Sequence, residues 1–356
     1  MIHSNRAKGG VAAARGWARA GSGAFIGCGL GAGPGRCGAL ASRASRGKPR
    51  RGAGTGETRR GLRANGAQTP RNLRRWAMMR RRNFAFAALA AAVLPGLGGI
   101  DAAFAPDAEP WPRWEAHDPD GTGTVDHGPW ARLLAARLRP DPDGPNLFDY
   151  GGVTAEERAA LDAYLEALAA TEVSALARPE QFAFWANLYN ALTVRVVLDH
   201  YPVESIRDID ISPGLFASGP WGAELIEVEG VPLTLDEIEH RILRPIWGDP
   251  RIHYAVNCAA IGCPDLRPAP WRAATLDADL DAAARDYVAD PRGLRVTADG
   301  LVVSKIYAWF IEDFGGDEGG VRAHLARYAP PDLRARIEDA EGVADTAYDW
   351  ALNDAR

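Results

Sequence analysis

The chain has 356 residues, of which 41 are Lys or Arg and 46 are Asp or Glu. Residues 1–105 contain 19 basic and 2 acidic residues, which leaves 41 − 19 = 22 basic and 46 − 2 = 44 acidic residues in 106–356. The acidic excess of this second part disfavours nucleic acid as a partner. The sequence shows no phosphate-binding loop and no dinucleotide-binding glycine pattern, which argues against phosphoryl transfer and hydride transfer.

Residues 1–77 are rich in Gly, Ala, Arg and Ser and show no apolar periodicity. A segment of this composition buries too little apolar surface to offset the entropy of ordering it. We therefore expect 1–77 to be a disordered basic leader, and a translation start at Met78 or Met79 would leave it untranslated. Nucleic-acid binding by this basic tail is the alternative.

Residues 78–105 have the features of an export signal. Three arginines at 80–82 are followed by an apolar run at 84–94 and by an A-x-A cleavage site at 103–105. The apolar run is shorter than the about 20 residues that span a bilayer. We expect a signal peptide at 78–105 and a periplasmic or secreted mature protein, 106–356, without membrane contact.

The mature part is predicted to form a single α+β domain. Thr154 and Glu157 form a capping box before one helix, and the next helix is expected at 180–201. A strand is expected at 225–228, and two short strands flank Asp299-Gly300, a sequence typical of a hairpin turn. Because these strands are short, we expect a small, largely antiparallel sheet packed on a buried central helix.

Further elements are expected near the end of the chain. Ser304 is predicted to cap a helix that runs to Phe314, and another helix is expected at 321–328.

The 180–201 segment is apolar on nearly all sides, which predicts a buried helix. Asn187 and Asn190 are three residues apart and share one face, next to Tyr189. A buried amide without a partner costs roughly 1–3 kcal/mol, so both side chains must form hydrogen bonds. They belong either to a structural network or to a catalytic site. In the second case, Trp185 and Tyr189 are the expected substrate-binding residues of this helix.

The segment 249–264 carries the candidate catalytic residues. A strand at 252–257 would place His253 and Asn257 on one face and Cys258 on the other. Cys263 follows a flexible loop and is freer to approach His253. If the strand ended at 256, Cys258 would be the closer thiol.

A thiol beside an imidazole is the minimum pair of nucleophile and base. Asn187, Asn190 or Asp313 would then orient the ring of His253. We expect Arg251 and Asn257 to contact the substrate.

Three structural interpretations compete with catalysis: a Cys258–Cys263 disulfide, two inert buried thiols, and a core histidine with satisfied nitrogens. Zinc bound by the two thiols and His253 is disfavoured, because the sequence offers no evident fourth ligand. We expect no metal and no cofactor.

Four separated motifs occur in an order that resembles the family of domain of unknown function 547, from about Trp114 to the C-terminus. They are residues 184–191, 249–264, the stretch from Ser304 to Phe314, and 348–353. The resemblance implies a domain but no reaction. A helix followed by a histidine-bearing strand is also the layout of papain-like and transglutaminase-like folds, although there the helix supplies the cysteine and here it offers Asn187 and Asn190.

The leading functional hypothesis is a thiol-dependent hydrolase or acyltransferase that acts on an amide or ester of a small molecule or peptide. Cys263 or Cys258 would be the nucleophile and His253 the base. The alternative is a non-catalytic binding or structural domain with a Cys258–Cys263 disulfide.

Overall fold

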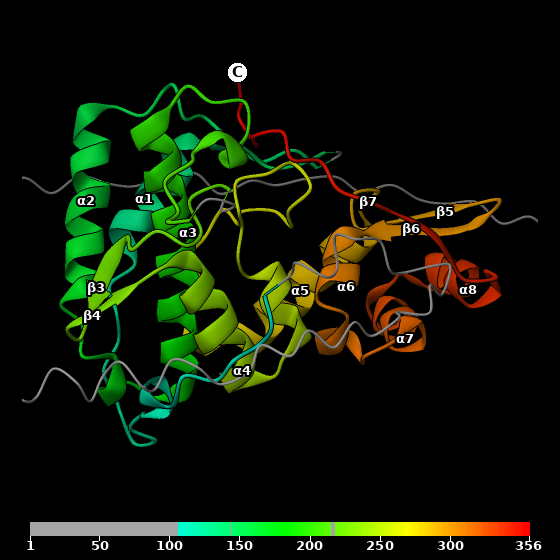
Figure 1. Cartoon of the computed structure of the whole chain (residues 1–356), viewed down its shortest axis with the longest axis horizontal. Helices are drawn as coiled ribbons and strands as arrows, with labels where there is room; N and C mark the ends of the chain where they lie inside the picture. The colour runs from blue at the N-terminus through cyan, green and yellow to red at the C-terminus, as the bar shows by residue number, and fades with distance from the viewer. Residues whose placement is uncertain (1–105, 143, 215–217) are drawn as a thin grey trace, which may run out of the picture. The chain divides into compact units, whose positions relative to one another are not determined.

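The computed structural model describes residues 106–142, 144–214 and 218–356 (Figure 1). The predicted leader at 1–77 and the predicted signal peptide at 78–105 lie outside the described residues. Within the described residues, no helix is both long enough and apolar enough to cross a membrane.

Helices and short strands together confirm the predicted α+β class. The α-helices are α1 (Gly128–Arg137), α2 (Ala155–Ala169), α3 (Arg178–His200), α4 (Arg244–Trp247), α5 (Leu276–Ala289), α6 (Lys305–Trp309), α7 (Glu318–Tyr328) and α8 (Pro331–Asp339). The strands are β1 (Leu138–Arg139), β2 (Leu147–Phe148), β3 (Ile226–Val228), β4 (Val231–Leu233), β5 (Leu294–Thr297), β6 (Gly300–Ser304) and β7 (Val343–Ala347). A π-helix, η6 (Glu237–Leu243), precedes α4, and the site also uses two 3-10 helices, η7 (Pro250–Tyr254) and η9 (Ile311–Phe314).

Helix α3 is the predicted central helix. A proline in its first turn favours helix initiation, and Pro202 prevents its continuation past Tyr201. Its side chains are buried almost continuously from Glu180 to Val197. Its principal neighbours are α2, which begins with the predicted capping box, and the π-helix η6. The central helix therefore packs mainly on other helices, where the sequence suggested a sheet.

Three small sheets are present in the described residues, and three of their four strand pairings are antiparallel. The hairpin predicted around Asp299-Gly300 is confirmed as β5 and β6, with Thr297 opposite Gly300. Gly300 has a φ of 125°, a conformation that glycine adopts without strain. Strand β7 pairs with β6 in parallel, and it leads the chain to the segment 348–353.

The strand predicted at 252–257 is wrong. The structure has the 3-10 helix η7 there, started by Pro250 and by the Asp249 side chain, which accepts a hydrogen bond from the Arg251 N–H. Residues 252–257 are all buried, so an alternation between a buried and an exposed face, the mark of a half-buried strand, does not exist in this segment. The assignment of His253 and Cys258 to opposite strand faces fails with it.

The helix predicted from Ser304 to Phe314 is interrupted in the structure. Ser304 does cap it, because its side chain accepts from the Ile306 N–H, but α6 ends at Trp309. The 3-10 helix η9 follows and ends at Gly315, which has a φ of 106°. Asp313, in the 3-10 helix after this break, lies within hydrogen-bond distance of Arg244 and His253.

Candidate functional site

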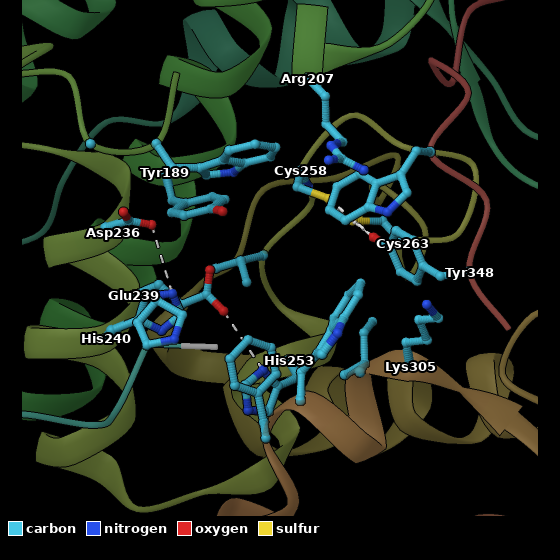
Figure 2. Close-up of a pocket in the computed structure, with 18 of the residues that line it drawn as sticks. Tyr189, Arg207, Asp236, Glu239, His240, His253, Cys258, Cys263, Lys305 and Tyr348 are labelled. Atoms are coloured by element: carbon cyan, nitrogen blue, oxygen red, sulfur yellow. Dashed lines mark hydrogen bonds and ion pairs between the residues drawn. The ribbon is translucent and has the colours of Figure 1, made fainter. Parts of the chain in front are cut away.

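A pocket of about 890 Å³ brings together residues from α3, η6, η7, α6 and the C-terminal segment. Cys258, Cys263 and Tyr348 lie on one side of it, whereas Asp236, Glu239 and His240 lie on the other (Figure 2). We call residues 257–264 the thiol loop, and we call Asp236, Glu239 and His240 the acid wall.

The side chain of Asn190 fixes the start of the thiol loop. Its amide donates to the Ala255 carbonyl at 2.9 Å and accepts from the Asn257 N–H at 2.8 Å. Asn257 continues the same pattern, because it accepts from the Ala259 N–H and donates to the Pro264 carbonyl, each at 2.8 Å. These bonds hold both ends of the loop, so the two predicted site amides act on the backbone that carries the thiols.

Asn187 forms an equivalent pair of bonds with Trp271. It donates to the Trp271 carbonyl at 2.9 Å and accepts from the Trp271 N–H at 3.0 Å, while the indole donates to the Ala255 carbonyl. Both hydrogen-bonding groups of Asn187 are therefore used within the protein. These contacts support the structural interpretation of the helix amides.

Two backbone features of the thiol loop bring the C-terminal segment against it. Ala259 has a φ of 61°, a left-handed conformation that is unusual and strained for a residue with a side chain. At Gly262, an added Cβ would come within 2.7 Å of the Asp349 nitrogen and 2.9 Å of the Tyr348 ring. Only glycine permits this approach, and it places the Tyr348 hydroxyl at the thiols.

Cys263 receives a set of hydrogen bonds that favours its thiolate. The Cys258 N–H approaches its Sγ at 3.0 Å, and the Tyr348 hydroxyl donates to it at 3.1 Å. Burial raises the pKa of Cys263, but hydrogen bonds from the Cys258 thiol, Tyr348 and the backbone outweigh burial and lower it. The pKa of Cys258 is raised by its hydrogen bond to Cys263 and by burial. Both cysteines are free thiols in the structure.

His253 lines the same pocket as the acid wall, and each of its ring nitrogens lies toward a carboxylate. Its Nε2 is 2.7 Å from Asp313 Oδ2, and its Nδ1 is 3.7 Å from Glu239 Oε1. Burial lowers the pKa of His253, but these two carboxylates outweigh burial and raise it. Of the three residues considered for orienting His253, Asp313 makes the contact. Among the described residues, no hydrogen bond joins His253 to either thiol.

Pro245 explains the wide turn of the π-helix that carries Glu239 and His240. A proline has no N–H to donate to the Arg241 carbonyl four residues earlier. The Trp111 N–H donates to this carbonyl instead, at 3.1 Å. The Arg244 N–H bonds to the Glu239 carbonyl five residues earlier, which is the π-helical pattern.

Arg244 links the π-helix to Asp313. Its Nε donates to Asp313 Oδ2 at 2.6 Å, and one terminal nitrogen lies 3.1 Å from His240 Nδ1. Glu239, His253, Asp313 and Arg244 thus form a buried chain of alternating charges. Burial raises the pKa of Glu239, but His240, His253 and Arg244 outweigh burial and lower it to about 2. Burial likewise raises the pKa of Asp313, but His253 and Arg244 lower it to about 2.

The predicted substrate-binding residues separate into two groups. Tyr189 lines the pocket. Trp185 and Arg251 do not line it. Trp185 is fully buried and packs edge-on against Trp114. Arg251 forms ion pairs with Asp249, Asp277 and Asp281.

Sequence reasoning missed the acid wall and Tyr348. Nothing local marks Asp236, Glu239 or His240 as different from other polar residues on a helix, here one whose start is capped by reciprocal hydrogen bonds between Thr234 and Glu237. Tyr348 belongs to the motif at 348–353 that resembles the DUF547 family. It lies 85 residues after Cys263, and the sequence gives no sign that the two side chains are in contact.

Residues 173–288 match the model of a family described as "Protein of unknown function, DUF547". The match is shorter than the resemblance seen in the sequence; it includes both thiols, His253 and Glu239, whereas Asp313 and Tyr348 lie beyond it. Neither the curated proteins nor the solved structures contain a match, so the papain-like or transglutaminase-like layout stays a prediction. Residues 173–288, which hold the central helix, the π-helix and the thiol loop, are therefore similar to the DUF547 family.

Proposed function

We propose that this chain is a thiol-dependent hydrolase or acyltransferase, exported from the cell, which acts on an amide or ester of a small molecule or peptide. Cys263 is the nucleophile in this proposal. The observation that carries it is the convergence of hydrogen-bond donors on Cys263 Sγ at the edge of a pocket of ligand size.

The proposed reaction begins with attack of the Cys263 thiolate on the substrate carbonyl carbon. The bond from this carbon to the leaving nitrogen or oxygen then breaks, and a thioester remains on Cys263. Cys258 keeps its proton because its pKa is raised, and as the proton donor in contact with Cys263 it protonates the leaving group. Water or an acceptor amine attacks the thioester, returns a proton to Cys258 and releases Cys263.

His253 has a different role from the base expected in the sequence. Both of its nitrogens face carboxylates, so it holds the acid wall in place as a positioning residue. The thiolate is instead stabilised by the donors on Tyr348 and Cys258.

Alkylation with iodoacetamide at pH 5 to 9, followed by mass spectrometry under reducing conditions, tests this proposal. We expect Cys263 to react with a midpoint below the usual thiol pKa of about 8.5. Tyr348→Phe removes one donor and should raise this midpoint by about one pH unit, since a hydrogen bond to a charged group contributes roughly 1.5–3 kcal/mol. Cys258→Ser is the control that keeps Cys263 as the only mature thiol. Thiols that react only above pH 8.5 would contradict the proposal.

The contact between the two thiols also favours a second candidate, a binding domain with a Cys258–Cys263 disulfide. In that case, protein isolated without reductant should carry no alkylatable thiol at 258 or 263. Its melting temperature should fall when reductant is added. A melting temperature that reductant leaves unchanged supports the nucleophile instead.

A further inference from the structure

The two thiols share one hydrogen-bonding partner. The Tyr348 hydroxyl lies 3.1 Å from Cys263 Sγ and 3.2 Å from Cys258 Sγ. The Cys258 N–H also donates to Cys263 Sγ, at 3.0 Å. Because both cysteines are free thiols, this contact has the arrangement of a reduced dithiol, which forms a disulfide when it loses two electrons.

The hydrogen bonds give the two sulfur atoms different roles. Cys263 Sγ accepts from the Tyr348 hydroxyl and from the Cys258 N–H, and such donors favour a thiolate. The contact with Cys263, and then burial, disfavour ionisation of Cys258, which keeps its proton. A thiolate attacks an oxidant, and a second thiol within reach captures the product. The pair therefore holds one attacking sulfur and one resolving sulfur.

The loop that joins the thiols keeps them together. The Asn257 side chain accepts from the Ala259 N–H and donates to the Pro264 carbonyl, each at 2.8 Å. The Cys263 N–H donates to the Ala260 carbonyl at 3.0 Å. Folding has therefore already met the entropic cost of bringing two residues five positions apart into contact.

The access to Cys263 indicates the kind of oxidant. This residue is 4% exposed, and it lines the same pocket as Cys258 and Tyr348 (Figure 2). A protein disulfide would have to bring its own chain to a sulfur atom that is almost fully covered. A hydroperoxide presents only two bonded oxygen atoms and needs little room. The burial of Cys263 thus favours a hydroperoxide over a protein disulfide.

We propose that Cys263 and Cys258 reduce a hydroperoxide and form a disulfide with each other in the reaction. This activity goes beyond the acyl chemistry of the proposed function, with which it shares the Cys263 thiolate. The disulfide of the second candidate function is a stable part of the fold. The disulfide inferred here forms in the reaction and is reduced again by a dithiol.

The reaction begins when the Cys263 thiolate attacks the terminal oxygen of the hydroperoxide. The O–O bond breaks, and Cys263 becomes a sulfenic acid. The leaving alkoxide takes the proton of the Cys258 thiol and departs as an alcohol. The Cys258 thiolate then attacks the Cys263 sulfur, the S–O bond breaks, and hydroxide leaves as the disulfide forms. The two sulfur atoms lose two electrons to the peroxide, and a dithiol returns them by thiol–disulfide exchange.

Oxidation of the reduced full chain by hydrogen peroxide at pH 7 tests the inference. The protein is reduced with dithiothreitol, freed from it, mixed with peroxide and quenched with N-ethylmaleimide at successive times. Mass spectrometry of the peptide that carries both cysteines measures the disulfide. We expect it to form about tenfold faster than peroxide oxidises free cysteine, because only about 3% of a thiol with a pKa of about 8.5 is thiolate at pH 7. Dithiothreitol should restore both thiols.

Two variants separate the roles of the sulfur atoms. Cys258→Ser should stop the reaction at the sulfenic acid, which dimedone traps on Cys263. Cys263→Ser should slow the oxidation of the remaining thiol to about the rate of free cysteine, since burial disfavours the Cys258 thiolate. An unchanged melting temperature shows that each variant is folded.

Wild-type protein that is oxidised no faster than free cysteine would overturn the inference, whatever the variants do. So would a Cys263→Ser variant that is oxidised as fast as the wild type, or faster oxidation by glutathione disulfide than by hydrogen peroxide. The outcome is separate from that of the proposed function. Alkylation of Cys263 below pH 8.5 without the rapid peroxide reaction overturns only this inference. Rapid disulfide formation in a protein that takes no acetyl group from 4-nitrophenyl acetate overturns only the acyl chemistry.

Discussion

The two sides of the pocket are held by different forces. The thiol loop is fixed by neutral hydrogen bonds between the amides of Asn190 and Asn257 and the backbone. The acid wall is fixed by the charged groups of His253, Asp313 and Arg244. Neutral amide bonds are insensitive to pH and salt, whereas a buried ion network depends on the protonation of each member. The thiol side should therefore keep its geometry under conditions that disrupt the acid side.

Removal of the Asp313 carboxylate should have the largest effect, because it disrupts the ion network that supports the acid wall. In Asp313→Ala, the buried Arg244 and His253 lose their shared partner. We expect the free energy of unfolding to fall by about 3–5 kcal/mol, as for other buried ion pairs that lose one member. Urea unfolding measures this loss. The control Asp345→Ala, at an exposed position of β7, should change stability by less than about 1 kcal/mol. A similar small change in Asp313→Ala would show that the network does not support the wall.

Acid should weaken the protein before it protonates Glu239 and Asp313, whose pKa values are about 2. Burial lowers the pKa values of His127, His240 and His324 to about 4, so between pH 6.5 and 4 the unfolded chain binds more protons than the folded one. Stability therefore falls as the pH falls through this window, on the order of 3 kcal/mol for each histidine. Asp236, with its pKa raised to about 6, offsets part of the loss. Urea unfolding at pH 7, 5.5 and 4.5 measures the slope.

His253 acts in the opposite pH direction. Its pKa is raised, so its contribution is complete below pH 6.5 and is lost as the pH rises through the raised value. His127→Gln should reduce the acid slope, because it removes one of the three histidine protons taken up on unfolding. Stability that stays constant from pH 7 to 4.5 would refute this account.

The smallest expected effect is the difference between removing the Asn190 side chain and removing the Asn187 side chain from helix α3. Asn190→Ala and Asn187→Ala each leave buried backbone groups without a partner, at a cost of about 1–3 kcal/mol. Only Asn190 holds the thiol loop directly, so only Asn190→Ala should also shift the pH midpoint of Cys263 alkylation. A shift of the same size in Asn187→Ala would show that the loop is not held at this point.

The sequence by itself determined the elements that depend on local chemistry. The capping box at Thr154, the hairpin at Asp299-Gly300 and the burial of the central helix follow from residues only a few positions apart. The same reasoning required partners for Asn187 and Asn190, because a buried amide cannot remain unsatisfied. It failed at 252–257, where every residue is buried and the pattern of exposure that separates a strand from a helix is absent.

Only the tertiary structure decided the composition of the site. Asp313 reaches His253 across 60 residues, and Tyr348 reaches Cys263 across 85. The π-helical turn that carries Glu239 and His240 depends on hydrogen bonds from a distant segment around Trp111. Such contacts arise from packing between elements far apart in the chain, and a local sequence pattern carries no record of which elements meet.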